Sequence, residues 1–130
     1  MRNMATSTTL AMTFVLLLSA CGQQAHWFGI EFAKVSEDGH TITATFMTSP
    51  PDSKGVFCTK VTNTALAESP TQVTIGIEVR NDCEPLFPWE KGRITSAVAY
   101  PREQRFLLKE PLAGRRLVDQ ATHQDVFRTK

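Results

Sequence analysis

The thiol of Cys21 stands where its chemistry could anchor the chain. It follows the tripeptide Leu18-Ser19-Ala20 at the end of an apolar run that extends from Leu10 to Leu18. Small residues before a cysteine give a peptidase room to cut, and the cysteine can then accept a lipid through a thioether. The apolar run is about half the length of a membrane-spanning helix. We therefore expect it to be removed as the core of a signal peptide and not retained as a span.

The segment from Leu18 to Cys21 resembles the lipobox of bacterial lipoproteins. The resemblance implies a diacylglycerol on Cys21, whose buried acyl chains would hold a small domain on a bilayer at about 0.8 kcal/mol per methylene. It implies a lipid-anchored location on the extracytoplasmic face of the cell membrane. The expected division is a signal peptide over 1–20, a lipidated cysteine and tether over 21–27, and one domain over 28–130. An ordinary signal peptide with a chance cysteine and an uncut spanning helix are the alternatives.

Two cysteines, Cys58 and Cys83, remain once Cys21 is assigned to the lipid. An exported chain with two remaining cysteines most simply joins them in one disulfide. Zinc is a poor rival, because no second Cys or His lies at ligand spacing beside either residue. We expect a structural disulfide between them.

The other reactive side chains do not form a catalytic or metal-binding pattern. His26, His40 and His123 lack the ligand spacing of a metal site, and the adjacent carboxylates of Glu37 and Asp38 are typical of a solvated turn. The chain has no Gly-x-Ser-x-Gly elbow, no glycine-rich phosphate loop and no Cys-x-x-Cys pair. We expect no enzyme activity, no cofactor and no metal.

The elements that must position these cysteines are predicted to be strands. Apolar residues alternate with polar ones from Phe28 to Ala33, and more clearly from Thr41 to Phe46, before a loop over 49–55 that holds two prolines and a glycine. Further strands are expected over 93–100 and 105–108, and a short terminal hairpin pairs 117–118 with 126–127. Many short strands without helical periodicity favour an all-β fold, an antiparallel immunoglobulin-like β-sandwich preceded by a lipoprotein signal peptide.

A hairpin accounts for the spacing of the cysteines. The segments 56–67 and 71–81 are both rich in β-branched residues, and Glu68-Ser69-Pro70 supplies a turn between them. With the turn near position 70, opposed residues have numbers that sum to about 140, as Val61 and Val79 or Ala65 and Ile75 do. Cys58 and Cys83 sum to 141 and would lie across the open end, one register step away, which a bulge or fraying could absorb.

The charges are balanced overall but uneven along the chain. The sequence has 14 Lys and Arg against 13 Asp and Glu, and a neutral balance argues against nucleic acid as a partner. Residues 21–90 hold four basic and nine acidic side chains, whereas residues 91–130 hold nine basic and four acidic. Either the basic part gathers on one face and meets anionic headgroups or glycopolymers, or oppositely charged strands lie side by side and cancel.

The segment from Glu110 to Asp119, followed by Thr122, Asp125 and Val126, resembles small actinobacterial secreted or lipoprotein domains of uncharacterised function. In that pattern a Pro-Leu-Gly turn leads to Arg, a valine pair and Asp, and the resemblance implies location and fold with no activity attached. The residues themselves predict a reversal in which Gly114 takes a positive φ and Arg115 or Arg116 pairs with Asp119. A small anionic site is the alternative to this ion pair.

Large apolar residues in the segment 83–92 are the candidate partner-binding group. Phe87 and Trp89 stand among prolines in what composition indicates is a loop. Trp89 could cap the core over the disulfide, or the rigid aromatics could anchor a partner, because Trp is frequent among interface hot spots. A further alternative places Trp27 and Phe28 at the bilayer interface.

Taken together, these features favour a membrane-anchored extracytoplasmic lipoprotein that acts as a non-catalytic binding or accessory module of the cell envelope. The expected partners are the membrane, through the lipid anchor, and an envelope protein or wall polymer. The alternative is a small carrier lipoprotein that holds an apolar ligand between its sheets.

Overall fold

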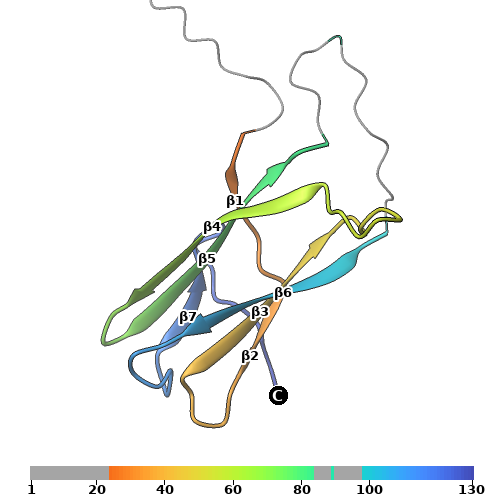
Figure 1. The fold of residues 1–130 in the computed structure, drawn as a ribbon. Helices are drawn as coiled ribbons and strands as arrows, with labels where there is room; N and C mark the ends of the chain where they lie inside the picture. The colour runs from red at the N-terminus through yellow and green to blue at the C-terminus, as the bar shows by residue number, and fades with distance from the viewer. Residues whose placement is uncertain (1–23, 84–88, 90–97) are drawn as a thin grey trace, which may run out of the picture.

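The computed structural model describes residues 24–83, 89 and 98–130, and these residues form strands and connecting loops without a helix. Figure 1 shows how the strands are arranged, and eight strands make up the fold. They are β1 His26–Phe28, β2 Phe32–Val35, β3 Thr41–Thr48, β4 Thr59–Glu68, β5 Gln72–Asn81, β6 Tyr100–Leu107, β7 Arg116–Asp119 and β8 Arg128–Thr129. Cys21 and Phe87 lie outside the described residues.

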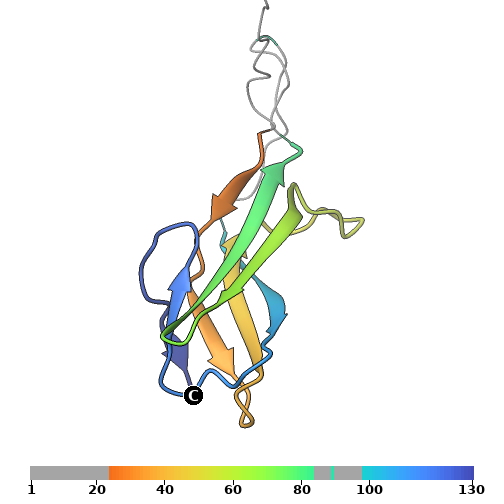
Figure 2. The same cartoon turned by 90° about the vertical axis from the view of Figure 1, so that its left-hand side faces the viewer.

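The strands form two four-stranded sheets packed face to face (Figures 1 and 2). In the first sheet β5 is central, with β4 along one side and β1 and β7 along the other. The second sheet has the order β6-β3-β2-β8. Antiparallel pairs dominate, and the two parallel pairs are β5 with β7 and β2 with β8. The expectation of an all-β sandwich is confirmed.

The core between the sheets comes from the alternation of apolar residues along two central strands. On β3 the side chains of Ile42, Ala44 and Phe46 are buried, as the sequence pattern predicts. On β5 the buried residues Val73, Ile75, Ile77 and Val79 all point to the same face. Leu112, Leu117 and Val126 from the C-terminal part close the core. The alternating pattern therefore fixes which face of each central strand is inside.

The segment from Phe28 to Ala33 was predicted as one strand, but in the structure it crosses from the first sheet to the second. β1 ends at Phe28 in the first sheet, and β2 begins at Phe32 in the second. The amide of Ile30 donates to Asp119 Oδ2 at 2.9 Å and the amide of Glu31 donates to the Thr45 carbonyl. The predicted tether over 21–27 is also too long, because its last two residues belong to β1 and pair with β5.

The predicted hairpin is confirmed, with a bulge in its first strand. Val61 pairs with Val79 as expected, but Ala65 pairs with Gly76 and not with Ile75, because the register shifts by one residue between Val61 and Asn63. A bulge of this kind adds one residue to one strand and leaves the partner strand regular. The cysteines lie just beyond the ladder, where the amide of Asp82 donates to the Cys58 carbonyl.

The C-terminal strands are partly as predicted. β6 is a single strand that includes Pro101, which an edge strand tolerates because its outer side makes no ladder bonds. The expected strand over 93–100 lies mostly outside the described residues. The terminal hairpin is reduced to a bridge between Val118 and Asp125, and β8 instead joins β2.

The sandwich has two ends, which we name after their contents. The disulfide pole holds the start of β1, the ends of β3 and β5, and the starts of β4 and β6. The turn pole holds the connections 36–40, 69–71 and 108–115. Figure 1 shows β1 and the end of β5 at the top and these connections at the lower left. Every strand of the central hairpin therefore runs from one pole to the other.

Candidate functional site

Cys58 and Cys83 form the predicted disulfide at the disulfide pole. Their Cα atoms are 5.1 Å apart, a separation typical of disulfides. Cys58 is buried, and the side-chain oxygen of Asn81 accepts a hydrogen bond from the Cys83 amide at 3.0 Å. The disulfide therefore fixes the point at which the chain leaves β5.

Of the two predicted partner-binding residues, Trp89 lies within the described residues. It has 78% of its surface exposed, so it does not cap the core as one interpretation expects. Trp27 and Phe28 are likewise not both available to a bilayer, because Phe28 packs edge-on against Phe46 with the ring centroids 6.2 Å apart. Trp27 lies over Gly76, where an added Cβ would come within 3.0 Å of its ring.

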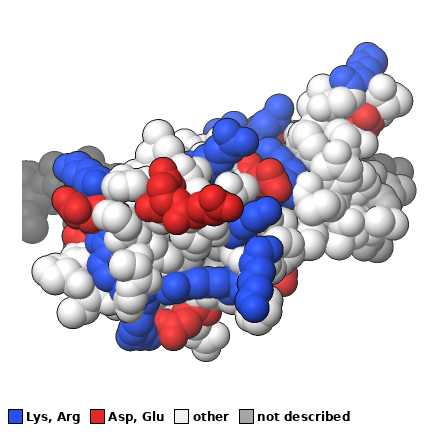
Figure 3. Space-filling view, turned by 90° about the horizontal axis from the view of Figure 1, so that it is seen from below, with Lys and Arg blue, Asp and Glu red and all other residues white. Residues whose placement is uncertain are grey.

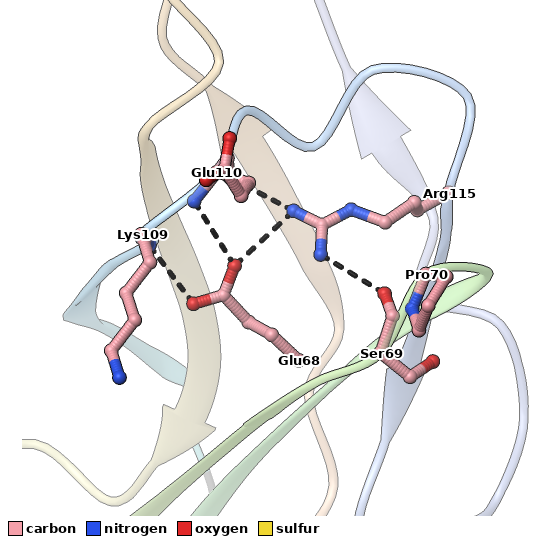
Figure 4. Close-up of a pocket in the computed structure, with 6 residues that line it drawn as sticks. All are labelled: Glu68, Ser69, Pro70, Lys109, Glu110 and Arg115. Atoms are coloured by element: carbon pink, nitrogen blue, oxygen red, sulfur yellow. Dashed lines mark hydrogen bonds and ion pairs between the residues drawn. The ribbon is translucent and has the colours of Figure 1, made fainter.

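An open cleft of about 470 Å³ lies at the turn pole (Figure 4). It is lined by residues of the β4–β5 turn and of the 108–115 loop, namely Glu68, Ser69, Pro70, Lys109, Glu110 and Arg115. The β4–β5 turn is closed by Ser69, whose amide donates to the Gln72 carbonyl and whose hydroxyl oxygen accepts from the Gln72 amide. The cleft thus lies between a turn of the first sheet and a loop that follows the second.

Glu68 and Arg115 of this cleft are bonded to each other and to nearby backbone atoms. Glu68 accepts hydrogen bonds from the amides of Lys109 and Glu110 at 2.9 and 3.3 Å. The Arg115 guanidinium donates to Glu68 Oε1 at 3.2 Å and to the Ser69 carbonyl at 3.1 Å. It also donates to the carbonyls of Glu110 and Pro111. We call this set the Glu68–Arg115 latch, and it joins the two sheets at the turn pole.

The latch changes the acidity of its carboxylate. The amide of Lys109 is the largest cause that lowers the pKa of Glu68; burial opposes it, and the Glu110 amide and the Arg115 guanidinium lower the pKa further. Figure 4 shows the Lys109 side chain extending away from the Glu68 carboxylate. The Glu68 carboxylate is therefore held by the two backbone amides and by Arg115, and not by the Lys109 ammonium.

The predicted ion pair between Asp119 and Arg115 or Arg116 is wrong. Arg115 pairs with Glu68, and Arg116 Nη2 pairs with Asp125 Oδ1 at 2.7 Å. Asp119 is buried and accepts from backbone amides, because its side chain points between the sheets toward the crossover and not toward the turn. The residue with a positive φ in this turn is Ala113, at 47°, and not Gly114.

Arg102 is a site residue that sequence reasoning missed. It projects from β6 toward the sandwich interior, and its Nη1 donates to the Thr59 carbonyl at 2.6 Å. Its Cζ lies 4.2 Å from the ring centroid of Phe57 and 5.3 Å from that of Phe46. Burial lowers the pKa of Arg102, although a guanidinium stays protonated in proteins. A signal was present, because Arg102 lies on the same face of β6 as Gln104 and the buried Phe106, while the residues between them are exposed.

Two smaller charge interactions lie at the loops. The Ser36 hydroxyl, followed by the His40 amide, lowers the pKa of Asp38 in the exposed turn before β3. At the disulfide pole Arg80 lowers the pKa of Asp82 through a hydrogen bond and an ion pair. Both carboxylates are solvated groups with local partners, which is the arrangement of structural turns.

The described residues contain no group of three or more His, Cys, Asp or Glu that could hold a metal ion. His40 has its Nδ1 3.1 Å from the Leu108 carbonyl, where it helps to join the 36–40 turn to the end of β6. No helix among these residues is long and apolar enough to cross a membrane.

Charges of opposite sign are mixed on the surface. In Figure 3 Asp and Glu side chains lie between Lys and Arg side chains on the face that is seen. The ion pair of Arg115 with Glu68 joins the basic C-terminal part to the acidic N-terminal part, whereas that of Arg116 with Asp125 lies within the C-terminal part. The Arg115–Glu68 pair is therefore an example of the alternative in which the two parts cancel locally.

The fold and these sites define the class of the domain: a disulfide-containing β-sandwich whose two sheets are joined by polar contacts at both poles. No family model, curated protein or solved structure matches the chain.

Proposed function

We propose that the protein is an extracytoplasmic lipoprotein, held on the cell membrane by a lipid on Cys21, whose β-sandwich is a non-catalytic binding or accessory module of the cell envelope. The observation that carries the proposal is the Cys58–Cys83 disulfide in a domain that begins five residues after the lipobox-like cysteine. Disulfides persist in oxidising compartments, and a lipobox directs a chain to such a compartment.

The arrangement of polar groups supports a binding role over a catalytic one. The carboxylates of Glu68 and Asp119 and the guanidiniums of Arg102 and Arg115 are engaged in contacts that hold the fold. An active site needs a nucleophile or acid–base group aimed at a substrate position, with its partners arranged around that position. The groups described here are instead aimed at backbone atoms of the same chain.

The carrier alternative has less support. The space between the sheets is filled by fully buried side chains, among which Phe46, Ile42, Ile75 and Leu112 are the largest. A carrier needs an internal cavity of several hundred Å³ lined by apolar groups. The cleft at the turn pole is open and lies among charged residues.

The anchor is tested by fractionating cells that express the wild-type chain or Cys21→Ala. The wild type is expected in the membrane fraction and the variant outside it. The double variant Cys58→Ala/Cys83→Ala is the matched control, because it removes the other thiols and should stay on the membrane. A processed Cys21→Ala chain that remains membrane-bound would contradict the lipid anchor.

The binding role is tested by capture from detergent-solubilised envelope with the full lipidated chain. Trp89→Ala is compared with Phe127→Ala, which removes another aromatic residue of similar exposure, 70%, at the end of the chain next to β8. A partner lost only with Trp89→Ala would make the segment around Phe87 and Trp89 the recognition site. Enrichment of a small apolar molecule without any protein or polymer would instead favour the carrier.

A further inference from the structure

Exposed apolar side chains gather at the disulfide pole. Val56 and Tyr100 are partly exposed, and Val98, just before β6, has 68% of its surface exposed. Phe57, the neighbour of Val56 in the chain, contacts the ring of Tyr100 with the centroids 5.6 Å apart, which brings this segment beside the start of β6. We call Val56, Val98 and Tyr100 the apolar cap. The Arg102 guanidinium also lies over the Phe57 ring, so Phe57 has a partner on each side.

Trp89 is exposed and lies in the sequence between Cys83 and Val98, which are both at this pole. Tryptophan and tyrosine are the side chains that favour the boundary between lipid and water. A pole with Trp89, Tyr100 and two exposed valines therefore has the composition of an interfacial surface.

The length of the chain between Cys21 and β1 indicates which pole lies next to the membrane. Cys21 and His26 are five residues apart, and an extended chain of that length spans at most about 18 Å. His26 pairs with Val79, seven residues along β5 from its start at Gln72, or about 23 Å from the turn pole. A lipid on Cys21 would therefore place the bilayer next to the disulfide pole and not next to the turn pole.

The charged residues at the disulfide pole also favour contact with a membrane. Lys54 and Lys60 are exposed in the segments on either side of Val56 and Phe57. Two acidic groups lie at the same pole and both have partners: the Asp52 carboxylate accepts from the amides of Lys54 and Val56, and Asp82, just after β5, is paired with Arg80. Lysine side chains beside an apolar surface favour contact with anionic headgroups.

We propose that the apolar cap and Trp89 lie in the interface of the bilayer, so that the domain stands on its disulfide pole with the turn pole directed away from the membrane. This orientation rests on the proposed lipid at Cys21. It has a consequence for partners: the Glu68–Arg115 latch and the cleft beside it face the envelope space, whereas Trp89 contacts lipid and not protein.

The test uses the full lipidated chain in vesicles of phosphatidylethanolamine and phosphatidylglycerol with brominated acyl chains. Trp27→Phe leaves Trp89 as the sole tryptophan. Its emission is expected to shift to the blue and to fall about twofold relative to unbrominated vesicles, because an interfacial indole lies within reach of the bromines. The matched control carries Trp27→Phe, Trp89→Phe and Thr71→Trp, which moves the reporter to the exposed turn between β4 and β5 and should show no quenching.

A second variant ties the result to the apolar cap. Val56→Asp/Val98→Asp, added to Trp27→Phe, should reduce the quenching of Trp89 while the chain still floats with the vesicles. Equal quenching of both reporters would overturn the upright orientation, and an unquenched Trp89 would assign this pole to a protein partner instead. The mass of the N-terminal peptide separates the two proposals: without a lipid on Cys21 both fail, whereas a lipidated chain with an unquenched Trp89 overturns the orientation alone.

Discussion

Removing the disulfide with Cys58→Ala/Cys83→Ala should cost a large part of the stability of this domain. The two cysteines are separated by 25 residues, and in the chain-entropy treatment the closure of such a loop in the unfolded state contributes about 3.5 kcal/mol. Folded domains have about 5–15 kcal/mol in total. The melting temperature should therefore fall by about 15 °C. Alanine is chosen because Cys58 is buried and a hydroxyl there would need a partner.

The assay is urea unfolding followed by circular dichroism, with the midpoint and the m-value fitted separately. The m-value should rise in the variant, because the unfolded chain without the cross-link exposes more surface. The wild type reduced with dithiothreitol serves as an independent control and should unfold at the midpoint of the variant. A loss below about 1 kcal/mol with an unchanged m-value would refute the reasoning, since it would mean that the unfolded chain was never constrained by the disulfide.

Three further predictions concern single residues. Gly76→Ala should destabilise the fold by about 1–3 kcal/mol, because its Cβ would lie 2.7 Å from the Cβ of Gln120; an unchanged urea midpoint would contradict this. Asp119→Asn should cost about 1–3 kcal/mol, because an amide cannot accept from both backbone amides that now donate to the carboxylate, and a thermal melt measures the loss. The pKa of Glu68 is held below its ordinary value of 4.5, chiefly by the amide of Lys109. The contribution of Glu68 to the stability of the fold is therefore present above pH 4.5 and is lost as the pH falls through the lowered pKa. The urea midpoint of the wild type should thus fall more steeply below pH 4.5 than that of Glu68→Gln, and parallel curves would show that the latch adds nothing.

Local sequence patterns were sufficient wherever a single strand decided the outcome. The alternation along Thr41–Thr48 and Gln72–Asn81 predicts both the strands and their buried faces, because the period of two is a property of one extended chain. The turn near Pro70 and the pairing of Val61 with Val79 follow from the same local arithmetic. The disulfide was predictable because a hairpin brings its two open ends together.

Local sequence patterns did not predict where the chain passes from one sheet to the other or where the strand register shifts. The run from Phe28 to Phe32 keeps its alternation across the crossover, so periodicity alone cannot show that β1 and β2 belong to different sheets. The position of the bulge near Thr62 cannot be predicted from the sequence either, and this bulge shifts the partner of Ala65 by one residue.

The sequence by itself determined the all-β class, the inside faces of the central strands, the main hairpin and the pairing of its cysteines, because each depends on residues close together in the chain or related by one turn. Only the tertiary structure decided that Arg115 meets Glu68, that Arg102 meets Thr59 and that Asp119 meets Ile30, which are 47, 43 and 89 residues apart. An arginine or aspartate can satisfy its hydrogen bonds with many partners. Which of them it finds depends on how the two sheets are stacked, and no local pattern carries that information.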